Sequence, residues 1–82
     1  MIYLRTAAGI FQVKYSPSLT VDQMVYGVTN EHGLEIRESW NVQETQTGRV
    51  LLSAENPVDD RNYHLNAILI RRGSKASAFA PT

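Results

Sequence analysis

The chain has 82 residues with eight basic and eight acidic side chains, so its formal net charge at pH 7 is zero. This length supports one domain with a single small core, and the charge balance gives no broad field that would attract nucleic acid or an acidic membrane. The absence of cysteine excludes disulfides, thiolate metal sites and a cysteine nucleophile. No apolar run reaches the roughly 18 residues needed to span a bilayer. We therefore expect a cytoplasmic protein that is a monomer on its own and needs no cofactor.

Two short alternating segments open the chain. Within residues 1–6, Ile2 and Leu4 fall on one side, and residues 10–15 alternate again after a turn that contains Gly9. Glycine takes the positive φ that tight turns require. The two segments are therefore predicted to form an antiparallel hairpin.

The clearest helical pattern spans residues 21–32. Its apolar side chains recur at i, i+3, i+4 and i+7, which places them on one stripe; they are Val21, Met24, Val25 and Val28. Thr20 and Gln23 have the spacing of a capping box at the start, and Gly33 suits the left-handed residue that follows a helix. The stripe requires a partner surface to bury it.

Three further strands are predicted downstream. Residues 40–44 and 49–52 flank a turn ending in Gly48, and residues 63–72 contain a nearly continuous apolar run, typical of a central strand. Two segments are expected to connect these elements, namely residues 35–39 and a surface loop at 53–62 with one helical turn near 58–61. Trp40 is expected to be a buried core anchor.

This order of elements, ββαβββ, predicts an α+β fold in which a mixed five-stranded sheet packs on one helix. The last strand should lie in the middle of the sheet, parallel to the first, which is the β-grasp arrangement. The helix stripe is expected to pack on six side chains, which are Ile2, Leu4, Val13, Trp40, Leu65 and Leu69.

Over residues 1–73 the chain resembles ubiquitin-like proteins in the order and spacing of its parts. The features that carry the resemblance are the opening Met-Ile-Tyr-Leu-Arg-Thr, the cap at Thr20, the helix end at Gly33, the hairpin that begins Trp40-Asn-Val-Gln, the Asp59-Asp60-Arg61-Asn62-Tyr63 turn and the closing Ile68-Leu69-Ile70-Arg71-Arg72-Gly73. The hairpin resembles that of bacterial ubiquitin-like domains, in which a Trp often opens the third strand. The resemblance implies a ubiquitin-like β-grasp fold.

The resemblance also implies a function as a prokaryotic or phage-borne protein modifier, or its precursor. Residues 74–82 are small and lack periodicity, so they are expected to form a flexible tail, whose removal would expose Gly73 for activation and conjugation. Arg71 and Arg72 would then dock on an acidic enzyme surface. The partners would be activating and conjugating enzymes or a peptidase. Conjugated members of the family end in two glycines, whereas Gly73 stands alone here.

The alternative function is a ubiquitin-like binding module that is never conjugated, such as an adaptor, an inhibitor or a small subunit of a larger complex. It would use an open face of the sheet, formed by polar Asn41, Gln43 and Asn66 beside Ile68 and Ile70. Ile68 and Ile70 are flanked by Arg71 and Arg72. A small apolar patch with such a basic rim is typical of a protein-binding surface. The other interpretation of these positions is that the chain's own tail covers them. Within that tail, Phe79 is a candidate docking anchor.

No catalytic or metal-binding constellation is recognised. His32 and His64 have no arranged partner in the sequence, and Asp59-Asp60 lacks the further oxygen ligands of a calcium loop. We therefore expect neither an enzyme nor a metal site.

Overall fold

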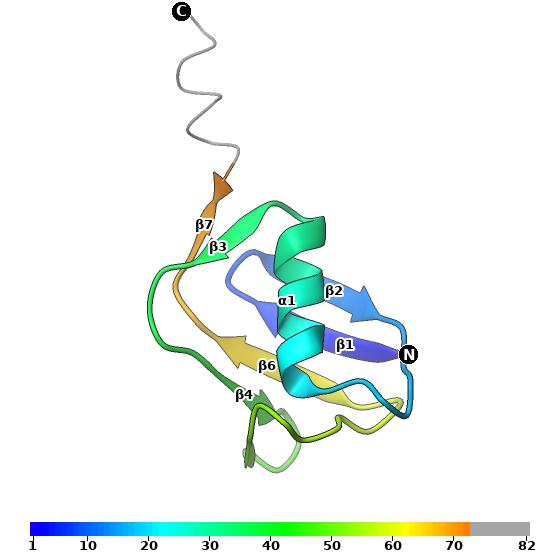
Figure 1. Ribbon diagram of the computed structural model, residues 1–82. Coiled ribbons are helices and arrows are strands. Elements are labelled where there is room, and N and C mark those ends of the chain that lie inside the picture. The colour runs from blue at the N-terminus through cyan, green and yellow to red at the C-terminus, as the bar shows by residue number, and fades with distance from the viewer. Residues whose placement is uncertain (73–82) are drawn as a thin grey trace, which may run out of the picture.

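The computed structural model describes residues 1–72, so the expectations for Gly73 and for a flexible tail at 74–82 concern residues outside the described part of the chain. Figure 1 shows the elements in chain order, which are β1 (Ile2–Thr6), β2 (Gly9–Val13), α1 (Val21–Glu31), β3 (Leu34–Ile36), β4 (Asn41–Glu44), β5 (Val50–Leu51), β6 (Asn62–Asn66) and β7 (Leu69–Arg71). Within these residues no helix has the length and apolar character needed to cross a membrane.

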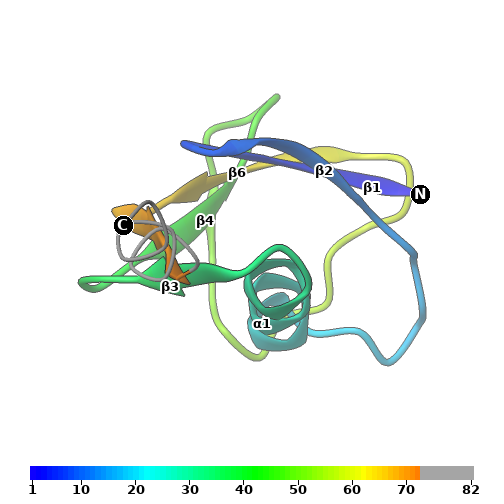
Figure 2. The same ribbon diagram turned by 90° about the horizontal axis from the view of Figure 1, so that it is seen from above.

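The strands form a five-stranded sheet in the order β2-β1-β6-β4-β5 and a two-stranded sheet of β3 and β7. β1 and β6 pair in parallel at the centre, and every other pair is antiparallel. Figure 2 shows α1 lying on one side of the larger sheet. The predicted α+β class is confirmed, as is the central position of the last long strand parallel to the first.

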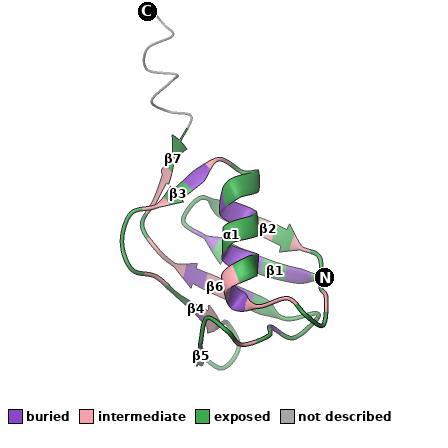
Figure 3. Cartoon of the chain, in the orientation of Figure 1, coloured by how far each residue is buried: buried purple, intermediate pink, exposed green. Residues whose placement is uncertain are grey.

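The core lies between α1 and the inner face of the sheet. Residues alternate between the two faces along β1 and β6, and Figure 3 shows the resulting alternation of buried and exposed positions. The cluster of buried side chains consists of Ile2, Leu4, Val21, Met24, Val25, Val28, Val42, Leu51, Tyr63 and Leu65. All four residues of the predicted helix stripe belong to it.

Both ends of α1 follow the sequence signals. The backbone N–H of Gln23 donates to Thr20 Oγ1 over 3.2 Å, and the N–H of Thr20 donates to Gln23 Oε1 over 3.1 Å. These reciprocal bonds confirm the capping box. The helix ends at Glu31, one residue earlier than predicted, and Gly33 has the expected left-handed conformation with φ of 66°.

Three expectations for the chain after the helix are wrong. The single strand predicted at 63–72 is divided into β6 and β7, which belong to different sheets. β7 pairs with β3. Residues 35–39 were expected to form only a connection, but residues 35 and 36 belong to β3. Residues 58–61 form a turn without a helix, in which Asp60 takes a positive φ of 60°.

Trp40 is also placed differently from the prediction. It packs against the core but remains partly exposed, because it precedes β4 and lies beside α1 rather than beneath it. The fully buried aromatic residue is Tyr63, whose relative exposure is 1%. Its hydroxyl accepts a hydrogen bond from the backbone N–H of Val58 over 2.8 Å. This bond lets a polar aromatic side chain occupy the core.

Candidate functional site

The face of the sheet opposite α1 carries one outward residue from each of its five strands in a continuous row. The row follows from the register: Ile10 lies opposite Arg5, Arg5 beside His64, His64 opposite Gln43, and Gln43 opposite Val50. In Figure 2 no helix lies over this side of the sheet. We call these five residues, with Tyr3, Asn41, Asn66 and Ile68, the outer face.

Three amide side chains are fixed at the β4–β6 end of the outer face. The Nδ2 of Asn66 donates to Asn41 Oδ1 over 2.8 Å and to Gln43 Oε1 over 2.7 Å. Gln43 in turn donates from Nε2 to the carbonyl of Gly48 over 3.0 Å. Because both hydrogens of the Asn66 amide are used, the three side chains hold one another in defined orientations.

Apolar side chains and one cation complete the outer face. Ile10, Val50 and Ile68 have relative exposures of 59%, 49% and 54%. A shallow depression of about 460 Å³ is bordered by Arg5, His64, Asn66 and Ile68, and by Glu38 among other residues. Arg5 also borders a smaller hollow of about 140 Å³ beside Tyr3 and Ile10. Arg5 therefore borders both hollows.

The structure brings together four of the five residues predicted for the binding surface. Asn41, Gln43 and Asn66 share hydrogen bonds, and Ile68 borders the same depression as Asn66. Ile70 lies elsewhere, because it belongs to β7 and is paired with Glu35 in the smaller sheet.

The two arginines proposed for enzyme docking are exposed at the end of β7. Arg72 is nevertheless engaged by the domain: its Nη2 donates to the carbonyl of Leu34 over 2.8 Å and to Asn30 Oδ1 over 3.1 Å. Its backbone N–H donates to the carbonyl of Gly33 over 2.7 Å. These bonds tie the end of the described chain to the end of α1. Gly73 lies beyond it, outside the described residues.

The sequence interpretation missed Tyr3, Arg5, Ile10, His64 and Val50 as members of the outer face. The alternation of β1 already placed Tyr3 and Arg5 opposite the buried side chains. The pattern of each strand does not predict the register between β1 and β6, because these two strands are far apart in the sequence. That register brings Arg5 and His64 together.

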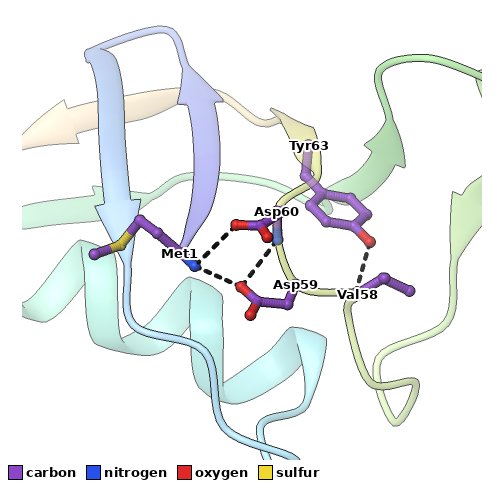
Figure 4. Close-up of polar contacts among 5 residues, drawn as sticks. All are labelled: Met1, Val58, Asp59, Asp60 and Tyr63. Atoms are coloured by element: carbon purple, nitrogen blue, oxygen red, sulfur yellow. Dashed lines mark hydrogen bonds and ion pairs between the residues drawn. The ribbon is translucent and has the colours of Figure 1, made fainter.

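The Asp59-Asp60 pair serves the fold (Figure 4). The α-amino group of Met1 donates to the Asp59 carboxylate and, over 3.5 Å, to Asp60 Oδ1. The bond to Asp59 raises the pKa of the Met1 amine above its ordinary value of 8.0, and the same bond lowers the pKa of Asp59 below 3.8. Within residues 1–72, no group of three or more histidine or acidic side chains is arranged to hold a metal ion.

The two histidines have different surroundings. The His32 ring lies against Phe11, with ring centroids 4.2 Å apart and planes inclined by 33°. His64 is half-buried within the outer face, between Arg5 and Gln43. Of the two, only His64 belongs to the outer face.

No protein-family model, curated protein or solved structure matches the chain. The assignment of a function therefore rests on the residues and geometry described above.

Asn66→Ala should lower the free energy of unfolding by about 1–2 kcal/mol, because it removes two side-chain hydrogen bonds at once. Asn62→Ala is the matched control, since Asn62 lies on the same strand and face and its side chain makes no hydrogen bond within residues 1–72. Urea unfolding of both variants measures the difference. Equal losses would contradict the proposed amide cluster.

Stability should fall at both ends of the pH range, for separable reasons. Asp59 and Glu55 have lowered pKa values, Asp59 chiefly through the Met1 amine and Glu55 chiefly through the backbone N–H of Leu52, then through Arg49. Their contributions are present above the ordinary values of 3.8 and 4.5 and are lost as the pH falls through the folded-state pKa. The raised pKa of the Met1 amine contributes stability below pH 8.0, which is lost as the pH rises through the folded-state pKa.

Melting temperatures across this range test the assignment. Asp59→Asn should flatten both the acid and the alkaline decline, whereas Glu55→Gln should flatten the acid decline alone. An alkaline decline unchanged by Asp59→Asn would show that the Met1 amine does not contribute.

Proposed function

We propose that this chain is a ubiquitin-like β-grasp domain that acts as a protein-binding module through its outer face. The β-grasp assignment is supported by the strand order β2-β1-β6-β4-β5, by the central parallel pair and by the single helix across one face. It agrees with the resemblance of residues 1–73 to ubiquitin-like proteins.

The observation that carries the binding function is the outer face itself, in which one residue from every strand of the larger sheet lies in a row with no helix above it. Its exposed Ile10, Val50 and Ile68 supply apolar area around a polar centre. A contiguous surface of this composition is typical of an interface with another protein.

The polar centre favours a partner with a carboxylate. The Arg5 guanidinium has no hydrogen bond or ion pair within residues 1–72, and arginine is among the residues that contribute most to binding at interfaces. A carboxylate of the partner would accept two parallel N–H bonds from it. The amides of Asn41, Gln43 and Asn66 are already ordered, so binding them costs little conformational entropy.

A protein modifier is the second candidate function. The observation in its favour is that the exposed Arg71 and Arg72 lie at the end of β7, directly before Gly73. The contacts of Arg72 with Leu34 and Asn30 favour the binding module instead, because docking of this side chain on an enzyme would break them. Arg72 thus has a structural role without any conjugation.

The binding function is tested by placing a photoreactive benzoyl-phenylalanine at position 68 in the native cell, identifying the crosslinked protein and measuring its affinity for the purified chain. Ile68→Asp should weaken that affinity by about 30-fold or more, because it places a charge in the apolar part of the interface. Val58→Asp is the matched control, since it makes the same kind of change at a residue that is also about half exposed, at 51%, and lies outside the outer face.

Equal affinities of the Ile68 and Val58 variants would contradict binding through the outer face. Intact mass of the protein from the same cells tests the second candidate. Loss of residues 74–82 together with Gly73 remnants on other proteins would establish the modifier.

A further inference from the structure

A second surface lies on the helix side of the molecule. It is a groove of about 340 Å³ between α1 and the segment that contains β3. Tyr26 borders it from the helix, Ile36 and Trp40 from the strand side, and Glu35 and Glu38 also border it. We call this the Tyr26–Trp40 groove.

The groove has exposed aromatic walls. Tyr26 is 63% exposed on α1, an unusual position for a large aromatic side chain, and Trp40 is partly exposed because it lies outside the core. Ile36 is half-buried and forms part of the apolar lining. Aromatic faces of this kind attract cations through the negative potential above the ring.

The acidic side chains of the protein are divided between two regions. Of the eight carboxylates in the chain, four are paired with basic groups around the β4–β6 loops, namely Glu44, Glu55, Asp59 and Asp60. The other four lie on α1, in β3 or between β3 and β4, and they are Asp22, Glu31, Glu35 and Glu38. None of these four forms an ion pair within residues 1–72.

Arg37 lies between Glu35 and Glu38 in sequence, and Arg71 lies on the strand paired with β3, so the acidic character is confined to the groove itself. Two of the unpaired carboxylates, Glu35 and Glu38, border the groove directly. The one cation that borders it, Arg72, is bonded to the carbonyl of Leu34 and to Asn30. Arg37 is not among the residues that border the groove.

We propose that the Tyr26–Trp40 groove docks a basic segment of a partner protein. An arginine or lysine of that segment lays its aliphatic stem along Ile36 and Trp40. Its charged head lies against an aromatic face and donates hydrogen bonds to Glu35 or Glu38. The unpaired carboxylates would repel nucleic acid and acidic lipid, which leaves a basic protein segment as the complementary occupant.

This inference does not rest on the proposed function of the outer face. The groove shares only Glu38 with the depression on the outer face, and it calls for a partner of opposite charge. The two proposals can fail separately, because Ile68→Asp changes only the outer face, whereas Tyr26 and Glu35 border only the groove.

Trp40, the only tryptophan in the chain, reports on the groove by its fluorescence. The probe is an acetylated and amidated decapeptide of alternating arginine and alanine, added to the full chain at low ionic strength. We expect a saturable change in Trp40 emission. The same peptide with citrulline in place of arginine keeps the shape but lacks the charge, and it should bind at least about tenfold more weakly.

The double variant Glu35→Gln with Glu38→Gln should weaken binding of the arginine peptide by about tenfold or more. The double variant Asp22→Asn with Glu31→Gln is the matched control, since it removes the same charge from α1 at residues that do not border the groove. Tyr26→Ala should also weaken binding. Because Tyr26 is exposed, we expect this variant to remain folded, and a thermal melt checks that it does.

Three results would overturn the proposal. Equal losses in the two double variants would show a long-range charge effect rather than a docking groove. Equal affinity of the citrulline peptide would show that the cation is not recognised. The third result concerns the double variant Lys75→Gln with Phe79→Ala, measured without peptide. A shift of its Trp40 emission relative to the unchanged chain would show that residues 74–82 occupy the groove.

Discussion

The parallel pairing of β1 with β6 is the contact on which the rest of this structure depends. It joins the first and last strands of the larger sheet at its centre, with Leu4 beside Tyr63 and Arg5 beside His64. The inward residues of both strands are buried under the apolar stripe of α1. A contact between segments so distant in sequence costs loop-closure entropy, which the shared burial of apolar side chains must offset.

The same pairing explains why this small domain has two different surfaces. One helix covers one face of the sheet, so the alternating outward residues of β1 and β6 remain exposed and align with those of β2, β4 and β5. On the helix side, β3 and the segment after it carry two unpaired carboxylates, Glu35 and Glu38, which border the same groove as Tyr26 and Trp40. The paired carboxylates Asp59 and Glu44 stabilise the loops around β6, and their charges are balanced by the Met1 amine and by Arg61.

Local signals in the sequence predicted the parts of the fold that depend on neighbouring residues. The capping box at Thr20, the left-handed Gly33 and the stripe from Val21 to Val28 each follow from side chains within one or two helical turns. The α+β class followed from the order of these elements. The polar side of the outer face was also predictable, since Asn41, Gln43 and Asn66 occupy outward positions of their strands.

Features set by long-range contacts escaped prediction. The apolar run near Ile68 reads as one strand, but β7 turns away from the larger sheet to pair with β3, which separates Ile70 from the outer face. Alternation along the strand places Trp40 on the same face as Val42 and so predicts a buried Trp40. The fully buried aromatic residue is instead Tyr63, whose hydroxyl accepts a hydrogen bond from the backbone N–H of Val58. Residue types indicate which side chains prefer burial, but the register between distant strands decides which of them achieve it.

The most direct test of this account is the nuclear Overhauser pattern of the larger sheet in solution. The structure predicts the cross-strand contacts of a parallel pair between residues 3–5 and residues 62–64, together with side-chain contacts from Arg5 to His64 and from His64 to Gln43. An antiparallel pattern between these segments, or β6 at an edge of the sheet, would contradict both the fold and the row of residues that forms the outer face.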